Sequence, residues 1–239
     1  HWVMSSAIYY RLLGQGTALT LHAGNSITMF LAMQNEELIR DPDIKTMVSM
    51  QNRYLTVWNI GFQLAYFSLA FACDFLTVTV GIIIFKVNLY ILLYPSFYFL
   101  FQIIFTIFWP IFIINREWLF PEFIDKIFSF KSNMIMHFFI VPAMLWELAF
   151  LPRPVPKSHA LNIGVLVFCY TLYNSLVIHT YNQRGLLPYP IFKLTYGTIY
   201  FPLFLLIAFI IGLGAYFGQW KLTAFFWGKE KKLGKDKFS

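Results

Sequence analysis

The amino-acid sequence predicts an all-α protein, a polytopic membrane bundle of about six transmembrane helices. Hydrophobic residues make up 59% of the 239 residues and charged residues only 12%, against roughly a quarter charged in soluble domains. The apolar residues gather in runs of about 20, the length of a helix that crosses the hydrocarbon. One core of this size cannot bury so much apolar surface. The composition excludes a typical soluble protein, and we expect the whole chain, 1–239, to form a single transmembrane domain.

Six windows are apolar enough to span the membrane, and they lie in order at about 3–23, 54–74, 89–114, 133–151, 160–180 and 197–219. The first is the least apolar because it contains Arg11, Gln15 and His22, which need neighbouring helices to shield them. Residues 75–88 fit either an extension of the second helix or a re-entrant or interfacial segment before Lys86. The connections are polar, amphipathic or proline-rich, as loops require, at 34–53, 115–132 and 152–158.

The basic residues indicate an orientation and a partner. The net charge is +7, and its only dense cluster is the segment 220–239 after the last span, with Lys229, Lys231, Lys232, Lys235 and Lys237. Such a tail is typical of a cytoplasmic segment that faces anionic lipid. It offers no aromatic platform for bases, so it indicates a membrane and no nucleic acid. With an even number of spans, we expect both termini to be cytoplasmic in the endoplasmic reticulum or plasma membrane.

A few polar side chains inside the spans are candidates for chemistry, because ionisable groups there mark a function or a buried pairing. They are Arg11, Asp74, His137, Glu147 and His179, joined by Thr56 at the start of the second span. The second and fourth helices enter the membrane from the same side. Thr56 follows Arg53 by three residues and His137 follows Ser132 by five. Both side chains therefore lie about 5–8 Å below one face and can meet.

A threonine hydroxyl becomes a nucleophile when a base removes its proton, and histidine is the side chain best suited to do so. The pair Thr56 and His137 therefore favours acyl transfer at the interface, where lipid esters lie. Simpler roles stay open, since a threonine can bond its own helix and a histidine can link two helices. Asn59, one turn after Thr56, can orient the nucleophile, donate to an oxyanion or hold helices together. Glu147 lies roughly 15 Å deeper than His137, too far to orient it.

Other chemistries have no motif in this sequence. It contains no H-E-x-x-H, no glycine-rich phosphate loop, no G-x-S-x-G and no paired cysteine motif. Its two cysteines, Cys73 and Cys169, lie in apolar runs and are expected to behave as small buried hydrophobes. No metal and no organic cofactor is implied.

Four runs of the chain resemble, in order and spacing, the androgen-induced gene family of multi-pass membrane threonine hydrolases. They are RYLTVWN at 53–59, FWPIFIINREWLFPEFID at 108–125, NMIMHFFIVPAMLWE at 133–147 and GLLPYP at 185–190. The resemblance implies a hydrolase of fatty acid esters of hydroxy fatty acids, with Thr56 and His137 as its catalytic pair. The chain departs from many relatives at Met134, where they have a second histidine, and in a shorter loop between the second and third spans.

We therefore expect an intramembrane lipid-ester hydrolase in which Thr56 attacks the carbonyl and His137 acts as base and then as acid. The substrate enters sideways from the bilayer, and helical spacing suggests a pocket wall at Ile60, Leu64, Ile140 and Val141. The alternative is a non-enzymatic membrane protein, either a transporter or a trafficking scaffold, with a polar path built from Arg11, Asp74, Glu147 and His179. A closed apolar cavity ending at Thr56 and His137 would favour hydrolysis, whereas a continuous polar channel would favour transport. The sequence identifies neither the physiological lipid nor a protein partner.

Overall fold

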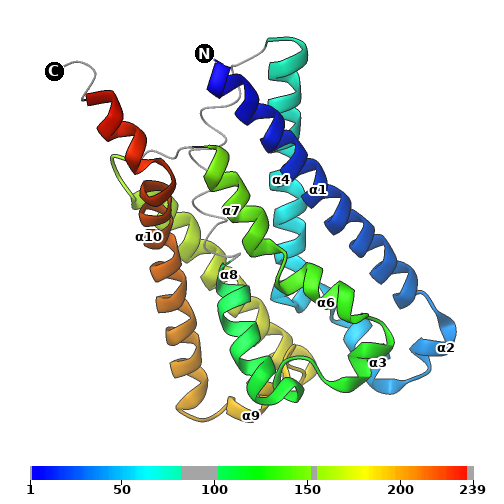
Figure 1. Cartoon of the computed structure of the whole chain (residues 1–239). Coiled ribbons are helices and arrows are strands. Elements are labelled where there is room, and N and C mark those ends of the chain that lie inside the picture. The colour runs from blue at the N-terminus through cyan, green and yellow to red at the C-terminus, as the bar shows by residue number, and fades with distance from the viewer. Residues whose placement is uncertain (1, 82–101, 152–154, 236–239) are drawn as a thin grey trace.

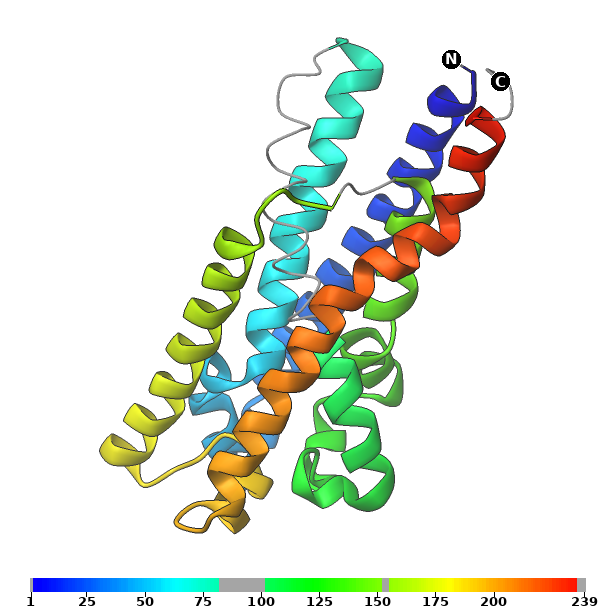
Figure 2. The same ribbon diagram turned by 90° about the vertical axis from the view of Figure 1, so that its left-hand side faces the viewer.

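The computed structural model describes residues 2–81, 102–151 and 155–235, and helices are the only regular secondary structure in these ranges. This confirms the all-α prediction. The long helices run side by side along one axis (Figure 1): α1 (Trp2–Met33), α4 (Leu55–Thr79), residues 102–115, α6 with α7, α8 (Ala160–Arg184) and α10 (Tyr200–Lys235). The first helical turns of α1 and the last turns of α10 lie at the same end of the bundle (Figure 2). That arrangement agrees with an even number of passes.

Short helices close the opposite end of the bundle (Figure 1): α2 (Glu36–Ile39), α3 (Pro42–Ser49), η1 (Gln51–Arg53), η2 (Arg116–Trp118), η3 (Glu122–Lys126) and α9 (Pro190–Thr195). Local chemistry fixes their starts. The Asn35 side chain accepts the backbone N–H groups of Glu37 and Leu38, and the Asp41 side chain accepts that of Asp43. Gly185, at a φ of 65°, ends α8 in the left-handed conformation that favours glycine.

Four helical segments of the described chain are long and apolar enough to cross a membrane: Leu55–Thr79, Phe130–Phe150, Ala160–Arg184 and Tyr200–Gly228. They correspond to the expected spans two, four, five and six. Helix α1 has the length, but buried polar residues such as Arg11 and Gln15 lower its hydropathy. The expected third span, 89–114, lies partly outside the described residues, and its described part is helical. Two boundaries move: residues 75–79 extend α4, and α10 continues to Lys235, into the segment expected to be a tail.

The expected single helix 133–151 is divided into α6 (Phe130–His137) and α7 (Ile140–Phe150). Pro142 explains the break, because it has no N–H to donate to the carbonyl of Phe138. The N–H of Phe139 donates instead to the carbonyl of Met134, five residues back (2.9 Å), which widens the turn. The indole of Trp109 donates to the carbonyl of His137 (3.1 Å). The break therefore leaves His137 as the last residue of α6.

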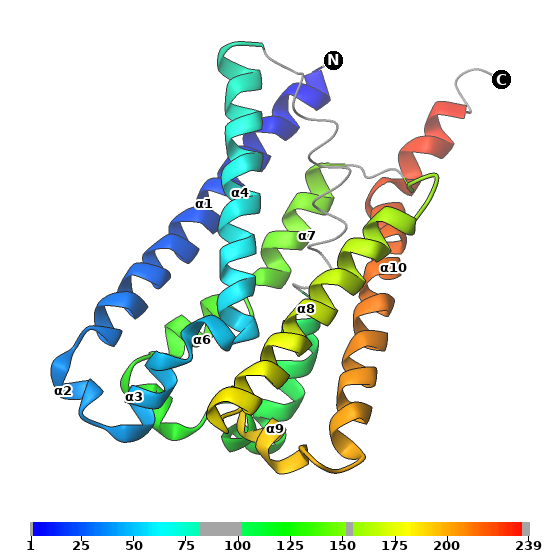
Figure 3. The ribbon, with the colours of Figure 1, turned by 180° about the vertical axis from the view of Figure 1, so that it is seen from behind.

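The charged side chains of three expected spans meet one another inside the bundle. Arg11 forms two hydrogen bonds with Asp74 (2.7 and 2.8 Å), and Gln15 donates to Asp74 (3.1 Å) and to Glu147 (2.7 Å). The hydroxyl of Tyr66 donates to the second oxygen of Glu147 (3.3 Å). All five side chains are buried. The network joins α1, α4 and α7, which lie side by side in Figure 3, and it satisfies charges that would be costly alone.

Candidate functional site

Thr56 and His137 lie together at the end of the bundle that α9 closes. Thr56 is the second residue of α4, and His137 is the last residue of α6. The Thr56 Oγ1 atom lies 3.3 Å from the His137 Nε2 atom, although 81 residues separate the two in sequence. Hydrogen bonds between a catalytic base and its nucleophile are often this long before a substrate binds. The geometry allows Nε2 to take the proton of the hydroxyl.

Asn133 holds the other nitrogen of the His137 ring. It lies one turn earlier on α6, with its Oδ1 atom 2.7 Å from Nδ1, and the carbonyl of the same residue is 3.3 Å away. Both oxygens only accept, so Nδ1 carries the ring proton. The neutral ring then presents the lone pair of Nε2 to Thr56. Thr56, His137 and Asn133 thus have the relative placement of a nucleophile, a base and an orienting group.

Aromatic side chains fix the plane of the imidazole. The ring of Phe108 stacks on the ring of His137, with centroids 3.6 Å apart and an interplanar angle of 8°. Only 3% of His137 is exposed. Because one face of the ring is covered and Nδ1 is bonded, the ring has little freedom to turn away from Thr56.

Tyr189 brings a further hydroxyl to Thr56. Its Oη accepts the backbone N–H of Leu55 (3.0 Å), the first residue of α4, and lies next to the N–H and hydroxyl of Thr56. These N–H groups belong to a helix N-terminus, where donors lack partners within the helix and favour negative charge. Burial raises the pKa of Tyr189 above its usual value, so the residue keeps its proton at neutral pH. The Tyr189 hydroxyl and the Thr56 N–H therefore lie beside the Thr56 hydroxyl, where an anionic oxygen would form.

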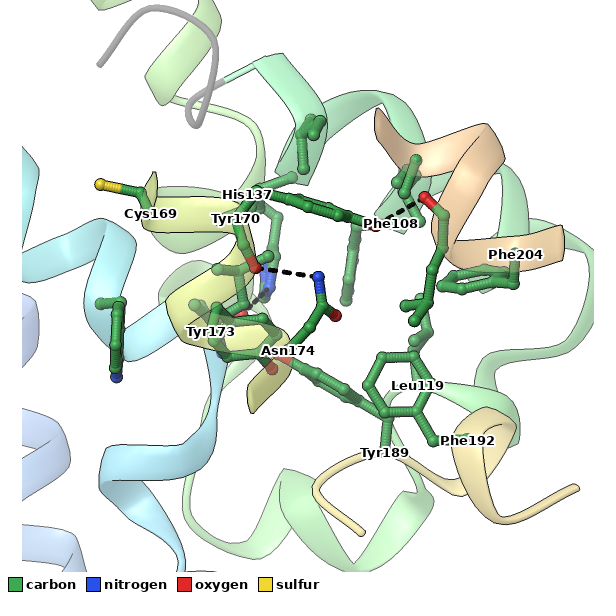
Figure 4. Close-up of a pocket in the computed structure, with 18 of the residues that line it drawn as sticks. Phe108, Leu119, His137, Cys169, Tyr170, Tyr173, Asn174, Tyr189, Phe192 and Phe204 are labelled. Carbon is green, nitrogen blue, oxygen red and sulfur yellow. Dashed lines mark hydrogen bonds between the residues drawn. The ribbon is translucent and has the colours of Figure 1, made fainter. Parts of the chain in front are cut away.

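An apolar cavity opens beside these groups (Figure 4). Figure 4 shows Tyr170 and Tyr173 of α8, Phe192 of α9 and Phe204 of α10 around it, with His137 at its edge. Further wall residues come from α4, the helix 102–115, α8, α10 and the turn after η2: Leu55, Trp58, Phe62, Ile103, Ile104, Ile107, Phe108, Leu119, Cys169, Asn174, Leu205 and Ala208. Hydrocarbon side chains and aromatic rings thus form most of the surface that a ligand of Thr56 would touch.

The wall positions expected from helical spacing do not line this cavity. Ile60 and Leu64 pack against the cluster that contains Phe108 and Met136, and Ile140 and Val141 pack in the cluster around Tyr66. The break after His137 is the physical reason for the second pair, because α7 starts a new helical register. On α4 the cavity is lined by the neighbouring face, which carries Trp58 and Phe62.

Asn59 is fully buried one turn after Thr56, but it is not among the residues that line the cavity. The ionisable residues of the alternative function divide into separate places. Arg11, Asp74 and Glu147 join the buried network, whereas His179 is exposed on α8. Asp74 follows Thr56 by 18 residues, about 27 Å along α4. Across the described ranges, no three His, Cys, Asp or Glu side chains are grouped to hold a metal ion.

The sequence contained signals for Asn133 and Tyr189 that the prediction did not use. Asn133 stands four residues before His137, the spacing that places two side chains on one face of a helix. Tyr189 stands in the run GLLPYP between two prolines, of which Pro190 is the first residue of α9. Its approach to Thr56 depends on how α8 and α9 fold back on α4, which no local pattern reports.

Comparisons with known proteins identify a family model and several named relatives that match this chain. A family model described as FAR-17a/AIG1-like protein matches residues 18–223, which include Thr56, Asn133, His137 and Tyr189. The androgen-dependent TFPI-regulating proteins of Mesocricetus auratus and Rattus norvegicus are each 28% identical to this chain over 185 residues. These alignments cover 76% of this chain, 79% of the Mesocricetus auratus protein and 80% of the Rattus norvegicus protein. The Homo sapiens protein of the same name is 30% identical over 122 residues, 49% of this chain and 53% of that protein. No solved structure matches the chain at a significant level.

Proposed function

The chain belongs to the FAR-17a/AIG1-like family, and on that premise we propose that it is an intramembrane hydrolase of lipid esters. It cleaves fatty acid esters of hydroxy fatty acids into a fatty acid and a hydroxy fatty acid. The observation that carries the proposal is the contact of Thr56 Oγ1 with His137 Nε2, with Nδ1 held by Asn133, at the edge of an apolar cavity. A nucleophile, an oriented base and a place for a hydrocarbon tail are the parts that ester cleavage needs.

In the first half of the reaction, His137 Nε2 takes the proton of the Thr56 hydroxyl while Oγ1 attacks the ester carbonyl carbon. The carbonyl oxygen becomes an oxyanion, which the Tyr189 hydroxyl and the Thr56 N–H stabilise. The tetrahedral intermediate then breaks the bond to the alkoxy oxygen. His137 gives its proton to that oxygen, so the hydroxy fatty acid leaves and the acyl group stays on Thr56.

In the second half, a water molecule attacks the acyl carbonyl and His137 takes the water proton. Collapse of the intermediate breaks the bond to Oγ1, and His137 returns the proton to Thr56. The fatty acid leaves, and the enzyme regains its starting protonation state. Asn133 accepts the Nδ1–H bond throughout, and this bond strengthens whenever the ring is positively charged.

The position of the pair in the bundle supports a substrate that comes from the bilayer. Thr56 stands at the first turn of a helix long and apolar enough to span the membrane, so the ester carbonyl would sit near the headgroups. With both termini in the cytoplasm, that level is the non-cytosolic face. A tail that stays among apolar side chains avoids about 0.8 kcal/mol per CH₂ of exposure to water.

The main competing function is non-enzymatic regulation, because the named relatives are TFPI-regulating proteins. A regulator needs no proton-transfer geometry. A regulatory function therefore does not explain why Asn133 holds His137 in the tautomer that presents Nε2 to Thr56. Transport is less well supported. Arg11 of α1 pairs with Asp74 of α4, and Gln15 of α1 donates to Glu147 of α7. His179 lies apart from them, exposed on α8.

The test is hydrolysis by the purified full chain in lipid nanodiscs, with release of the hydroxy fatty acid measured by mass spectrometry. We expect Thr56→Ala and His137→Ala to abolish turnover and labelling by a fluorophosphonate probe, and Thr56→Ser to retain part of both. Thr20→Ala is the matched control, because Thr20 is exposed on α1 and its hydroxyl bonds its own helix (2.9 Å to Gly16 O). Full turnover by Thr56→Ala would sink the proposal and favour the regulator.

A further inference from the structure

Six polar side-chain atoms without hydrogen-bond partners lie close together inside the bundle. They are both ring nitrogens of His22, and the amide nitrogen and oxygen of Asn59 and of Gln63. The three side chains are 1%, 1% and 0% exposed. Buried polar groups are almost always satisfied, and each exception needs an explanation such as water. Because these three unsatisfied side chains are neighbours, they together indicate one binding site.

The three side chains come from facing helices. Gln63 stands one turn after Asn59 on α4, and its side chain lies next to His22 of α1 without meeting hydrogen-bond geometry. Phe139, in the break between α6 and α7, packs against the His22 ring with centroids 6.0 Å apart. Helix α1 packs along α4 and against α6 (Figure 3). We call this group of three side chains, His22, Asn59 and Gln63, the polar chamber.

The polar chamber and the apolar cavity lie on two faces of α4 that meet at Thr56. Thr56, Asn59 and Gln63 follow one another at spacings of three and four residues, so they share one face of the helix. Trp58 and Phe62 line the apolar cavity from the adjacent face, and neither Asn59 nor Gln63 does. Asn59 lies about 4.5 Å from Thr56 along the helix axis.

We propose that the polar chamber binds water and delivers the molecule that hydrolyses the acyl group on Thr56. This inference rests on the proposed function. A buried water makes about three hydrogen bonds, so six free donors and acceptors suffice for about two waters. The chemistry also requires such a source, because an acyl chain in the cavity displaces solvent from that face of Thr56. A water handed over from Asn59 approaches the acyl carbonyl from the other face, within reach of His137.

The chamber predicts an effect on one half-reaction. We expect Asn59→Leu and Gln63→Leu to slow deacylation about tenfold for each hydrogen bond lost to the water, so acyl-Thr56 accumulates. Acylation should stay unchanged, since no water takes part in it. The midpoint of thermal unfolding, measured for each variant, shows that a slower deacylation does not come from loss of the fold.

The two rates are measured by rapid quench and mass spectrometry of the Thr56 peptide, with the full chain in nanodiscs. Gln219→Leu is the matched control, because it removes a fully buried amide on α10, at a distance from the site. It should leave deacylation unchanged. Equal deacylation rates in the unmodified chain and both variants would overturn the inference, while acyl-Thr56 would still support the proposed function. If no acyl-Thr56 forms in any chain, the proposed function fails.

A second measurement needs neither a variant nor turnover. Radiolysis of the unmodified chain in ¹⁸O water should label His22, because hydroxyl radicals form from waters bound beside it. Leu194, which is 63% exposed on α9 outside the expected spans, serves as the accessible reference. Labelling of Leu194 but not of His22 would show a dry chamber and overturn the inference, whatever the kinetics of hydrolysis.

Discussion

Replacing Asn133 by Leu should slow turnover while leaving substrate binding intact. The Asn133 Oδ1 atom lies 2.7 Å from His137 Nδ1, and the remaining acceptor, the Asn133 carbonyl, is 3.3 Å away. In the transition state the ring is positively charged, and a hydrogen bond to a charged group contributes about 1.5–3 kcal/mol. Each 1.36 kcal/mol is about a factor of ten in rate. We therefore expect kcat to fall about 10- to 150-fold.

The assay is steady-state hydrolysis of a long-chain ester in nanodiscs. KM should stay constant because Asn133 does not line the cavity. Asn133→Asp keeps an acceptor at the same place and should retain most of the activity. Asn162→Leu, which removes another buried asparagine on α8, controls for general loss of a polar group. An undiminished kcat in Asn133→Leu, or an equal loss in both leucine variants, would refute the orienting role.

Three further predictions concern the cavity, the buried network and the loops. Ala208→Phe places a ring in the cavity and should move the optimum of acyl chain length to shorter chains, measured with an ester series. Asp74→Asn leaves the Arg11 charge buried and should cost about 3–5 kcal/mol, seen as a lower midpoint of thermal unfolding in detergent. Arg11→Met with Asp74→Leu should restore much of that midpoint. Lys126, 2.7 Å from Asp41, lowers the pKa of that carboxyl. The contribution of ionised Asp41 to stability is therefore present at neutral pH and is lost as the pH falls through that lowered pKa. Hydrogen exchange of the α3 amides should report this loss, and Asp41→Asn should abolish the pH dependence.

The proximity of Thr56 and His137 could be predicted from sequence because it depends on few quantities. Span order fixes which helix ends share a face, and the rise of 1.5 Å per residue fixes depth. The proximity of these two residues required only these two quantities, whereas their proposed catalytic role rests on the family resemblance. Asn133 was within reach of the same reasoning, since it stands one turn from His137 on the same helix. The pairing of Arg11 with Asp74 and the contact of Gln15 with Glu147 could not be derived, because they depend on how α1 rotates against α4 and α7.

The cavity wall was beyond prediction for a physical reason. Helical spacing gives the residues that face the same way as Thr56 or His137, but it does not tell which neighbour fills that face. Beyond Thr56 the same face continues as Asn59 and Gln63 and meets α1. Beyond His137 the register is lost, because Pro142 ends the hydrogen-bond ladder.

The course of the cavity bears on how a lipid ester could lie in the protein. Along α4 its lining runs from Leu55 to Phe62, and along α10 from Phe204 to Ala208, which are lengths of about 10 and 6 Å. Both helices run from the end closed by α9 towards the end that holds the terminal segments (Figure 1). A tail in this cavity therefore lies parallel to the bundle axis, as lipid tails lie in a bilayer, with its carbonyl at the level of Thr56. Such a substrate keeps its bilayer orientation when it enters the protein. The proposed nucleophile, Thr56, then only needs to lie at the headgroup level, and its place in the first turn of a spanning helix puts it there.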